Sequence, residues 1–551
     1  MSGMHRTLMP ALCLAALATA PAQAAEPALS VDTMKNLTRE LSLDAFEGRA
    51  PGSAGEEKTL ALLKKSFSAA GLQPGNHGSW LQDVPLVQIT AQNVSDLAIT
   101  GGKQDLAFAY GPQMVAFSYR VTPKVDIRDS EVVFVGYGIN APEKGWNDYA
   151  GVDVKGKTVI ILVNDPDYET EGTEGLFNGR AMTYYGRWSY KYEEAARQGA
   201  VAALIVHDTL PAAYGWKVVE SSNTGPQHVA DAADGHMGAT RANGWIALAA
   251  ARSLLASAGQ DLDRLSAAAK QCGFKAVDLG LKASLSFDND IQKQSSKNVV
   301  GILPGSKRPD EYVLYTAHWD HLGRCGADAS GDDICNGAID NATGTAALVA
   351  LAEAHVAAGP AERSIVFLAV TAEESGLLGS ESYAANPVYP LAQTAGGVNM
   401  DAFSVTGPAR DVVVVGRGKS ELDAYLERAL ADQGRVATSE PTPEKGYYYR
   451  SDHFSLAKRG VPMIYFEGGE DLAEGGPAAG RAAAEDYTVN RYHAPGDDYD
   501  TNWYWRGVMS DLQLYYSNRR ELDDTSDWPN WVAGVEFRAG RDHSRAGAAT
   551  N

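Results

Sequence analysis

Two histidines and several acidic residues stand at positions where they could bind divalent metal ions. Most of them follow short apolar segments, as in Ala317-His318-Trp319-Asp320 and Val370-Thr371-Ala372-Glu373-Glu374. Imidazole nitrogen and carboxylate oxygen are the ligands of zinc and similar divalent ions in sites that keep coordination positions open. The candidate ligands are His318, Asp340, Glu374, Asp401 and His493.

Asp340 lies in Gly337-Ala338-Ile339-Asp340-Asn341-Ala342-Thr343-Gly344, directly before an expected helix. A helix N-cap is one explanation of this turn. The other is a carboxylate that offers one oxygen to each of two cations, with small neighbours that let both ions approach. Asp320 has a related use, because a carboxylate two residues after His318 could accept a hydrogen bond from its second ring nitrogen.

Glu373 and Glu374 are adjacent acids at the end of an otherwise apolar strand. Adjacent side chains point in different directions, so one carboxylate can bind metal while the other accepts a proton. A solvated strand end is the structural alternative. Gly376 and Gly379 favour a tight turn over a loose acidic loop.

The segments that carry these residues alternate between strand and helix from Ser296 onward. Helices are expected at Gly344 to Val356 and Glu421 to Gln433, and this alternation is typical of an α/β protein with a largely parallel sheet. Ligands of such sheets bind beyond the carboxyl ends of the strands, where the candidate residues stand. The expected strands are Asn298 to Leu303, Tyr312 to Ala317, Ile365 to Thr371, Val398 to Met400, Val412 to Val415 and Pro462 to Phe466.

A second unit is expected from about residue 127 to 270, between amino-terminal helices and this region. Its expected strands are Glu131 to Val135, Thr158 to Val163 and Ala202 to His207, with a helix from Tyr190 to Gln198. Residues 536–551, mostly small, polar or charged, are expected to form a flexible tail.

The bulk composition narrows the classes of partner. The formal net charge is −21, with 69 acidic against 48 basic residues, which disfavours nucleic acid as a partner. An acidic surface attracts cationic ligands such as peptide amino termini, although solubility explains it as well. The sequence gives no oligomeric state.

Residues 1–24 read as a signal peptide. His5 and Arg6 precede the apolar run Leu8 to Ala20, which ends in Ala22-Gln23-Ala24. Export with cleavage near Ala24, to the periplasm or the medium, is the expectation. The run is too short to span a bilayer, and no later segment approaches the required apolar length, so no membrane partner is expected.

Three cysteines follow the leader. Cys325 and Cys335 bracket a short loop that could close into a disulfide in an oxidising compartment, with a free thiol pair as the alternative. Cys272 is expected to be buried and inert.

The order His318-x-Asp320, Asp340, Glu373-Glu374, Asp401, His493 resembles metallopeptidase family M28, the dinuclear zinc aminopeptidases and carboxypeptidases related to glutamate carboxypeptidase. Three further segments carry the likeness, and it covers most of the chain after the leader. They are Ala45-Phe46-Glu47-Gly48-Arg49-Ala50-Pro51-Gly52-Ser53, Asn298-Val299-Val300-Gly301 and Arg450-Ser451-Asp452-His453-Phe454.

The resemblance implies two Zn²⁺ ions. Asp340 would bridge them, His318 and Asp401 would complete one site, and Glu374 and His493 the other. Glu373 would be the general base acting on a metal-bridged hydroxide, with Asp320 behind His318. The implied fold is the zinc-peptidase type, a mixed, largely parallel sheet flanked by helices.

The region 127–270 resembles a protease-associated domain, a small β-rich insertion, through Val133-Phe134-Val135-Gly136-Tyr137-Gly138 and Glu193-Glu194-Ala195-Ala196-Arg197-Gln198-Gly199-Ala200. The expected organisation is therefore a peptidase domain in two parts, residues 25–126 and 271–535, around this insertion.

The leading expectation is an exported aminopeptidase acting on peptides. A carboxypeptidase or dipeptidase on the same centre is the nearest alternative, and a non-catalytic binding protein is disfavoured because the metal set and Glu373 are complete. Tyr447, Tyr448 and Tyr449 are candidate oxyanion donors, with aromatic packing as the alternative, and Arg450 could bind a terminal carboxylate.

Overall fold

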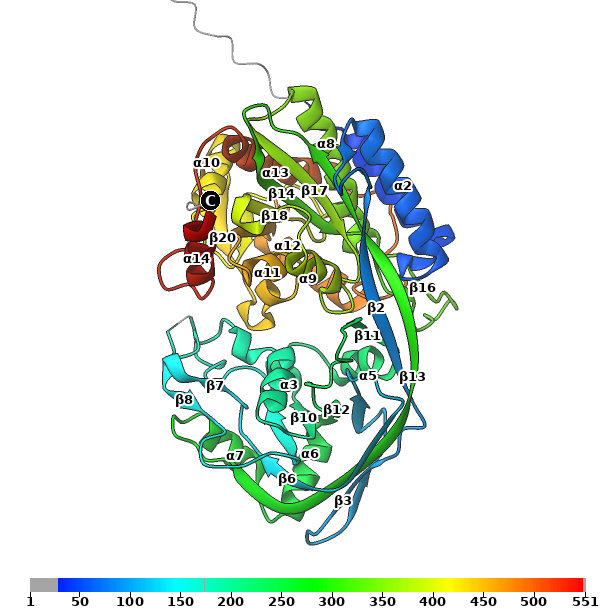
Figure 1. Ribbon diagram of the computed structural model, residues 1–551, viewed down its shortest axis with the longest axis vertical. Coiled ribbons are helices and arrows are strands. Elements are labelled where there is room, and N and C mark those ends of the chain that lie inside the picture. Colours follow the sequence, from blue (N-terminus) through cyan, green and yellow to red (C-terminus); the bar gives the residue numbers. More distant parts are fainter. Residues whose placement is uncertain (1–27, 173, 549–551) are drawn as a thin grey trace, which may run out of the picture.

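The computed structural model describes residues 28–172 and 174–548, and it forms two lobes joined along one edge (Figure 1). The predicted leader lies outside these residues. In the upper lobe of Figure 1 one sheet runs in the order β13, β17, β14, β18, β21, β19, β20. Its central pairs, from β17 through β14 and β18 to β21, are parallel, whereas β13 and β19 pair with them antiparallel. The predicted mixed, largely parallel α/β fold is confirmed. The bounds are β14 Arg308–His318, β17 Arg363–Val370, β18 Thr394–Asn399, β19 Asp411–Val415, β20 Val436–Ser439 and β21 Met463–Gly468.

Helices cover both faces of this sheet. Helix α8 (Gly344–Ala358) packs on β14 and β17 beneath α1 (Val31–Leu41) and α2 (Ala54–Ala70), so it is apolar nearly all round. The same core includes α10 (Asp423–Gln433) and α13 (Trp505–Asp523). The opposite face packs against α9 (Leu378–Ala385) and α11 (His453–Ala457). A sheet buried on both faces explains the continuous apolar runs of its strands.

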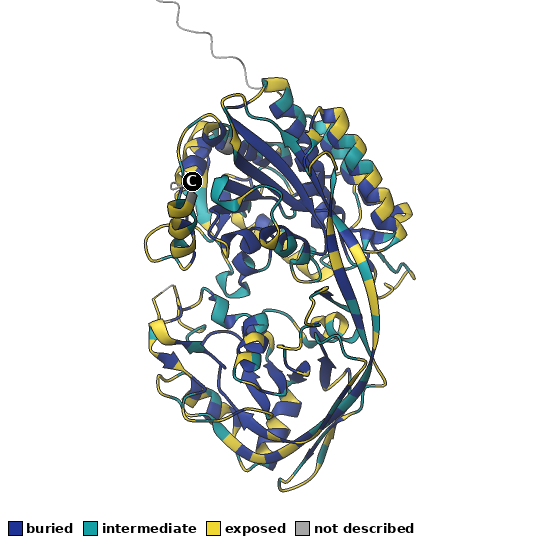
Figure 2. Cartoon of the chain, in the orientation of Figure 1, coloured by how far each residue is buried: buried dark blue, intermediate teal, exposed yellow. Residues whose placement is uncertain are grey.

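Strand β13 (Val277–Leu303) links the lobes and is far longer than the predicted strand at 298–303. It pairs with β17 and β1 (Gln73–Pro74) in the upper lobe and with β3 (Leu97–Thr100) and β6 (Lys124–Phe134) in the lower. Strand β2 (Leu81–Gln92) pairs with it from Asp288 to Val299. Figure 2 shows these two strands as a ribbon with much exposed surface between the buried ends.

The lower lobe has a parallel sheet of β6, β9 (Thr158–Leu162), β10 (Ala202–His207) and β12 (Ala242–Ala247), with β5 (Met114–Phe117) antiparallel at its edge. Helices α3 (Trp188–Arg197), α6 (Leu248–Ser257) and α7 (Leu262–Ala269) contribute to its cores. Hydrophobic residues between 97 and 117, which precede the predicted boundary at 127, pack in the same cores as hydrophobic residues after that boundary. The domain boundaries at 127 and 270 stay a prediction.

The carboxyl-terminal segment differs from the expected flexible tail. Residues Arg538–Ala548 form helix α14. Arg541 is buried there and donates hydrogen bonds to the carbonyl oxygens of Thr394 and Ala395 at 2.8 and 2.9 Å, which ties the helix to the start of β18. Within the described part of the chain, no helix combines the length and apolarity needed to cross a membrane.

Candidate metal centre

Three neighbouring strands of the upper sheet deliver polar side chains to one edge. His318 is the last residue of β14, Glu373 and Glu374 come shortly after β17, and Asp401 comes shortly after β18. Because β14 pairs in parallel with both β17 and β18, the carboxyl ends of all three strands meet. The structure thus brings together the strand-end residues that the sequence singled out.

Asp340 lies at the centre of this group, in the turn before α8. Its Oδ1 is 3.3 Å from Nε2 of His318, and its Oδ2 is 3.5 Å from Nε2 of His493. His493 follows α12 (Gly476–Asn490) and has positive φ, as do Ala372 and Ala402 beside the other candidate ligands. Such backbone is uncommon outside glycine and clusters at functional sites. The two oxygens of Asp340 therefore face two different imidazoles.

Each imidazole also faces a second carboxylate. Nε2 of His318 lies 3.2 Å from Oδ1 of Asp401, and Nε2 of His493 lies 3.1 Å from Oε2 of Glu374. One ligand atom from each of His318, Asp340 and Glu374 falls within 4.8 Å of the other two. The five residues form two nitrogen-and-oxygen sets that share Asp340.

The donor set fits divalent cations. In the described chain no lysine or arginine forms an ion pair with any of the three carboxylates, and their contacts are imidazoles and one hydroxyl. Carboxylates that are held close together and largely out of water are costly unless a cation offsets their charges, and a metal ion can do so. Two imidazoles and three carboxylates supply the ligand types of a two-zinc site.

The histidines and carboxylates strongly perturb each other's pKa. Burial opposes protonation of His318, but the charges of Asp401 and Glu373 outweigh it and hold its pKa well above the usual value. Burial raises the pKa of Asp340, but His318 and His493 outweigh burial and hold it well below its usual range. Protons on these imidazoles compete with metal ions, because a histidine must be neutral to bind one.

Glu373 differs from its neighbour. The oxygens of Glu374 contact His321 and His493, whereas Glu373 has no ion pair within the described residues. Burial raises the pKa of Glu373 well above its usual value, and the charges of Asp401 and Glu374 add to this against the opposing effect of His318. A carboxylate whose pKa is raised accepts a proton more readily, which is what a general base requires.

Asp320 lies behind His318, but the contact differs in detail from the predicted one. Nδ1 of His318 is 3.1 Å from the backbone carbonyl oxygen of Asp320, and the carboxylate Oδ1 is farther, at 3.8 Å. That Oδ1 instead accepts the backbone N–H of Glu373 at 3.2 Å. Burial raises the pKa of Asp320 to about 8. Its carboxylate orients the segment with the candidate base, and its carbonyl orients the imidazole.

Two residues tether the outer carboxylates and were not predicted. Nδ1 of His321 lies 2.6 Å from Oε1 of Glu374, and the Ser451 hydroxyl donates a 2.6 Å hydrogen bond to Oδ2 of Asp401. In both acids the other oxygen faces a candidate ligand histidine. The signals were present in the sequence, since His321 stands three residues after His318 and Ser451 lies in a quoted segment.

The early segment that contains Arg49 also supports the site. Arg49 is fully buried and donates to four backbone carbonyl oxygens at 2.6 to 2.9 Å. The acceptors are Leu41, Trp319, Asn336 and Gly337. Asp497 supports the same turn, since its carboxylate accepts the backbone N–H groups of Ile339 and Asp340 at 3.0 Å each. These contacts join the end of β14 to the turn that carries Asp340.

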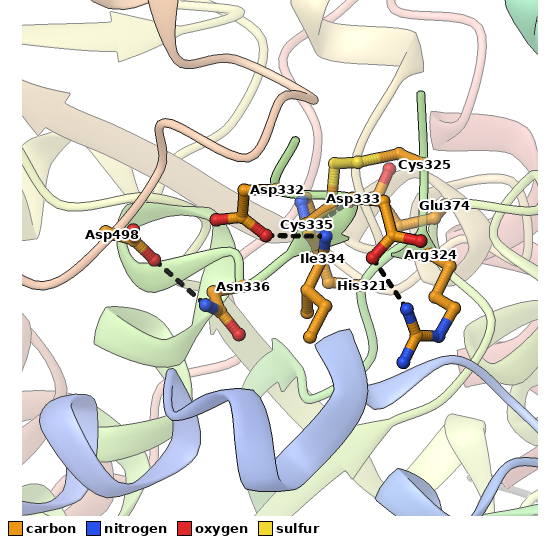
Figure 3. Close-up of a disulfide and its surroundings, with 10 residues drawn as sticks. All are labelled: His321, Arg324, Cys325, Asp332, Asp333, Ile334, Cys335, Asn336, Glu374 and Asp498. Carbon is orange, nitrogen blue, oxygen red and sulfur yellow. Dashed lines mark hydrogen bonds and ion pairs between the residues drawn. A yellow bond between two sulfur atoms is a disulfide. The ribbon is translucent and has the colours of Figure 1, made fainter. Parts of the chain in front are cut away.

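The disulfide Cys325–Cys335 closes the loop between these two parts of the site (Figure 3). The loop is pinned by β15 (Gly323–Arg324) against β16 (Ile334–Cys335). Asn336, next to the disulfide, donates to Oδ1 of Asp498 at 2.9 Å. Cys272 is free and exposed, so the expectation that it is buried was wrong.

The four candidate substrate residues separate into two groups. Tyr448 and Tyr449 are buried in an aromatic cluster with Phe454, Trp531 and Phe537. This is the aromatic packing that was expected as the alternative to a role as oxyanion donors. Arg450 lies over the Tyr447 ring at 5.3 Å and donates to the Tyr492 hydroxyl at 3.1 Å. The Tyr492 ring stacks on His493 at 3.9 Å, so Arg450 lies beside the metal centre.

Comparisons with known proteins agree with the interpretation of these residues as a zinc-peptidase site. Residues 298–517 match the model of peptidase family M28, which confirms the resemblance over that segment. Mouse (Mus musculus) aminopeptidase NAALADL1 is 31% identical over 109 residues, which are 19% of this chain and 13% of that protein. A probable zinc metalloprotease of Pyrenophora teres f. teres (strain 0-1) is 32% identical over 233 residues, 42% of this chain and 43% of that protein. The chain spans less than half the length of either relative.

A solved structure shares the fold. The aminopeptidase from Aneurinibacillus sp. strain AM-1 superposes with a TM-score of 0.53 at 20% identity, covering 91% of this chain and 95% of that one. The protease-associated domain remains a prediction.

Proposed function

We propose that this chain, which carries an M28 peptidase domain over residues 298–517, is an exopeptidase with two zinc ions that releases amino-terminal residues from peptides. One observation carries the proposal: the two oxygens of Asp340 face His318 and His493, and each histidine faces a further carboxylate. This arrangement suits a shared ligand between two cations.

In this proposal His318 and Asp401 would hold one ion, Glu374 and His493 would hold the other, and Asp340 would serve both. Two bound zinc ions would supply Lewis acidity, which lowers the pKa of a water molecule and polarises a carbonyl group. The protein residues fix the ligand directions through His321, Ser451 and Asp320.

Glu373 performs the proton transfers. Its carboxylate accepts a proton from the attacking water as the water oxygen bonds to the peptide carbonyl carbon, and it then donates that proton to the leaving nitrogen as the C–N bond breaks. Water is thereby divided between the two products, and Glu373 returns to its starting state. The raised pKa of Glu373 supports this double use.

Release from the amino end is supported by the names of the mouse relative and the Aneurinibacillus structure, both aminopeptidases, and by the net charge of −21. Arg450 favours the second candidate, a carboxypeptidase or dipeptidase on the same centre, since it could bind a terminal carboxylate. A purely binding role is disfavoured by the complete ligand set with Glu373 beside it.

A peptide panel tests the proposal. The purified zinc-loaded protein is offered peptides with free ends, with a blocked amino end and with a blocked carboxyl end, with and without a chelator. Chelator-sensitive cleavage that requires the free amine is expected. Cleavage that requires only the free carboxyl end would select the carboxypeptidase, and a metal content of one ion or none after zinc resupply would overturn the two-metal centre.

Export is the remaining part of the proposal. Sequencing the amino terminus of protein recovered from the periplasm or the medium is expected to begin near Ala25. Protein recovered only from the cytoplasm, with Met1 or Ser2 at its start, would contradict export.

A further inference from the structure

The turn that carries Glu373 contacts a histidine from a distant part of the chain. Nδ1 of His228 lies 3.1 Å from the hydroxyl oxygen of Ser375, which follows Glu373 by two residues. Nε2 of the same ring is buried and has no hydrogen-bond partner within the described residues. In that part of the chain, the Ser375 hydroxyl is therefore the group that the imidazole holds.

His228 lies on strand β11 (Gln227–Ala230), which is fixed to the ribbon between the lobes. β11 pairs antiparallel with β2. Directly after β11, the N–H of Asp231 donates to the carbonyl oxygen of Pro85 at 3.0 Å, and the Asp231 carboxylate pairs with Lys293 of β13 at 2.8 Å. Figure 1 shows β11 beside this ribbon, at the level where the two lobes meet. The imidazole is thus attached to both strands that join the lobes.

The backbone of the turn around Ser375 needs support. Ala372, Gly376 and Leu377 have φ angles of 52°, 101° and 64°. For a residue other than glycine this conformation costs about 1 to 3 kcal/mol, and it persists where surrounding contacts hold it. Within the turn, the N–H groups of Gly376 and Leu377 donate to the carbonyl oxygen of Glu373 at 2.8 and 2.9 Å.

Side chains from two different elements hold this turn from outside. Oδ1 of Asp320, after the end of β14, accepts the N–H of Glu373 at 3.2 Å, and His228 of β11 contacts Ser375. Fixed points at positions 373 and 375 restrict rotation of the peptide units between them. A small displacement of a reacting group lowers its rate strongly, so these contacts affect proton transfer by Glu373.

A neutral imidazole suits this task. Burial lowers the pKa of His228 below the usual histidine value. The Ser375 hydroxyl can donate to Nδ1 or accept from it, so the contact forms with either tautomer. A neutral ring also holds the turn without placing a positive charge beside Glu373, and such a charge would make the carboxylate a weaker proton acceptor.

We propose that His228 is a positioning residue for the general base: its Nδ1 holds Ser375 and thereby fixes the direction of the Glu373 side chain. The inference rests on the proposed function, in which Glu373 transfers the protons. The ribbon that joins the lobes thus also holds the turn that carries the base.

Substitutions at both ends of the contact test this with the zinc-loaded full chain and a peptide that the wild type cleaves. His228→Ala and Ser375→Ala are each expected to lower kcat by about 10-fold, with KM within about twofold of the wild type and zinc content unchanged. The double variant is expected to be no slower than either single one, because each removes the same contact. His77→Ala, at an exposed histidine of the upper lobe, is the control and keeps the wild-type kcat.

Two amide variants separate the ring nitrogens of His228. The side-chain amide of asparagine reaches about as far as Nδ1 of histidine, and that of glutamine about as far as Nε2. His228→Asn is therefore expected to restore most of kcat, whereas His228→Gln is expected to behave like His228→Ala. The reverse order would overturn the inference, since it would assign the function to Nε2.

The outcomes separate this inference from the proposed function. Unchanged kcat in His228→Ala, with a wild type that cleaves the peptide, overturns the inference and leaves the proposed function standing. A wild type that cleaves no peptide overturns both. Losses that multiply in the double variant, or loss of zinc from either single variant, contradict an effect through the base. Where His228→Ala fails to fold, Ser375→Ala removes a single hydroxyl, and its kcat decides.

Discussion

The Ser451 hydroxyl donates a 2.6 Å hydrogen bond to Oδ2 of Asp401, which leaves Oδ1 of Asp401 to face His318 at 3.2 Å. The serine itself accepts a 2.6 Å hydrogen bond from the amide of Asn399, so its direction is fixed from the strand below. One oxygen of this carboxylate is thus held by the serine, and the other stays directed toward the candidate ligand His318. Such outer contacts fix the geometry of metal ligands.

Ser451→Ala is expected to weaken binding of one of the two proposed metal ions by about 10- to 100-fold, because Asp401 loses the contact that orients it. Metal content measured against a series of chelator concentrations checks this. A variant that keeps both ions as firmly as the wild type would show that Asn399 and the backbone suffice. Ser330→Ala, in an exposed loop, is the control.

His321→Ala is expected to have the matching effect on the other ion, since His321 lies 2.6 Å from Oε1 of Glu374. We expect a loss of about 10- to 100-fold in affinity for that ion. The double variant with Ser451→Ala separates the two sites: independent tethers give two additive losses in affinity. Equal affinity of His321→Ala and wild type for both ions would refute the tether.

Glu373→Gln is expected to retain both ions and lose at least about 100-fold in kcat, the contribution typical of a general base. The change removes the proton acceptor and leaves the five candidate ligands intact. Metal analysis and steady-state kinetics on the same preparation check it. Turnover close to that of the wild type would assign the base elsewhere.

Arg49→Met is expected to lower the free energy of unfolding by about 3 kcal/mol or more, because four buried carbonyl oxygens lose their donor. Denaturant unfolding of the metal-free protein measures this without the contribution of bound zinc. Arg39→Met, exposed on α1, is the control, and equal midpoints for the two variants would contradict the structural role.

Acid pH is expected to destabilise the fold partly through His355. Burial, with a smaller effect of Arg520, lowers the pKa of His355 to about 3, and its Nε2 lies 2.8 Å from the Tyr315 hydroxyl. The unfolded chain, with a histidine pKa of about 6.5, binds the extra proton between pH 6.5 and 3, so stability is full above 6.5 and falls as pH drops through this window. At pH 5 the loss is about 2 kcal/mol from this residue.

His355→Gln checks the pH effect by removing the proton site. The unfolding free energy of the variant is expected to depend less on pH between 6.5 and 4 than that of the wild type, by up to one proton. His77→Gln, exposed in the upper lobe, serves as the control. Parallel curves for His355→Gln and wild type would mean that the histidine is protonated in the folded state as well.

The sequence could single out the candidate metal ligands because most of them follow a local signal, the end of an apolar strand or a turn of small residues. His318, Glu374 and Asp401 were predictable in this way, since parallel strands end at one edge. The predicted helices and strands of the upper lobe differ from the observed ones mostly by a few residues at their ends.

Other features depend on contacts that no local pattern carries. The local sequence around Tyr448 and Tyr449 is compatible with tyrosines that face a substrate and with tyrosines that are buried. Only their packing against Trp531 and Phe537 shows that they are buried. The extension of β13 was missed because no single pattern runs along the strand. Buried and exposed residues alternate over 278–289, residues 290–295 are mostly exposed, and residues 298–301 are buried. The loop before α3 docks on the upper lobe through contacts such as that of Arg180 with Glu444, which are 264 residues apart in sequence.

The exposed stretch 290–295 of β13 pairs throughout with β2, and this stretch lies between the buried ends of the strand. The lobes are therefore joined by hydrogen-bonded strands and not by a free linker, so their separation changes only when this ribbon bends or twists. A bound peptide that draws the two lobes together works against the elastic stiffness of the ribbon. Residues with no contact to substrate would then help to set the energy needed to close the site around it.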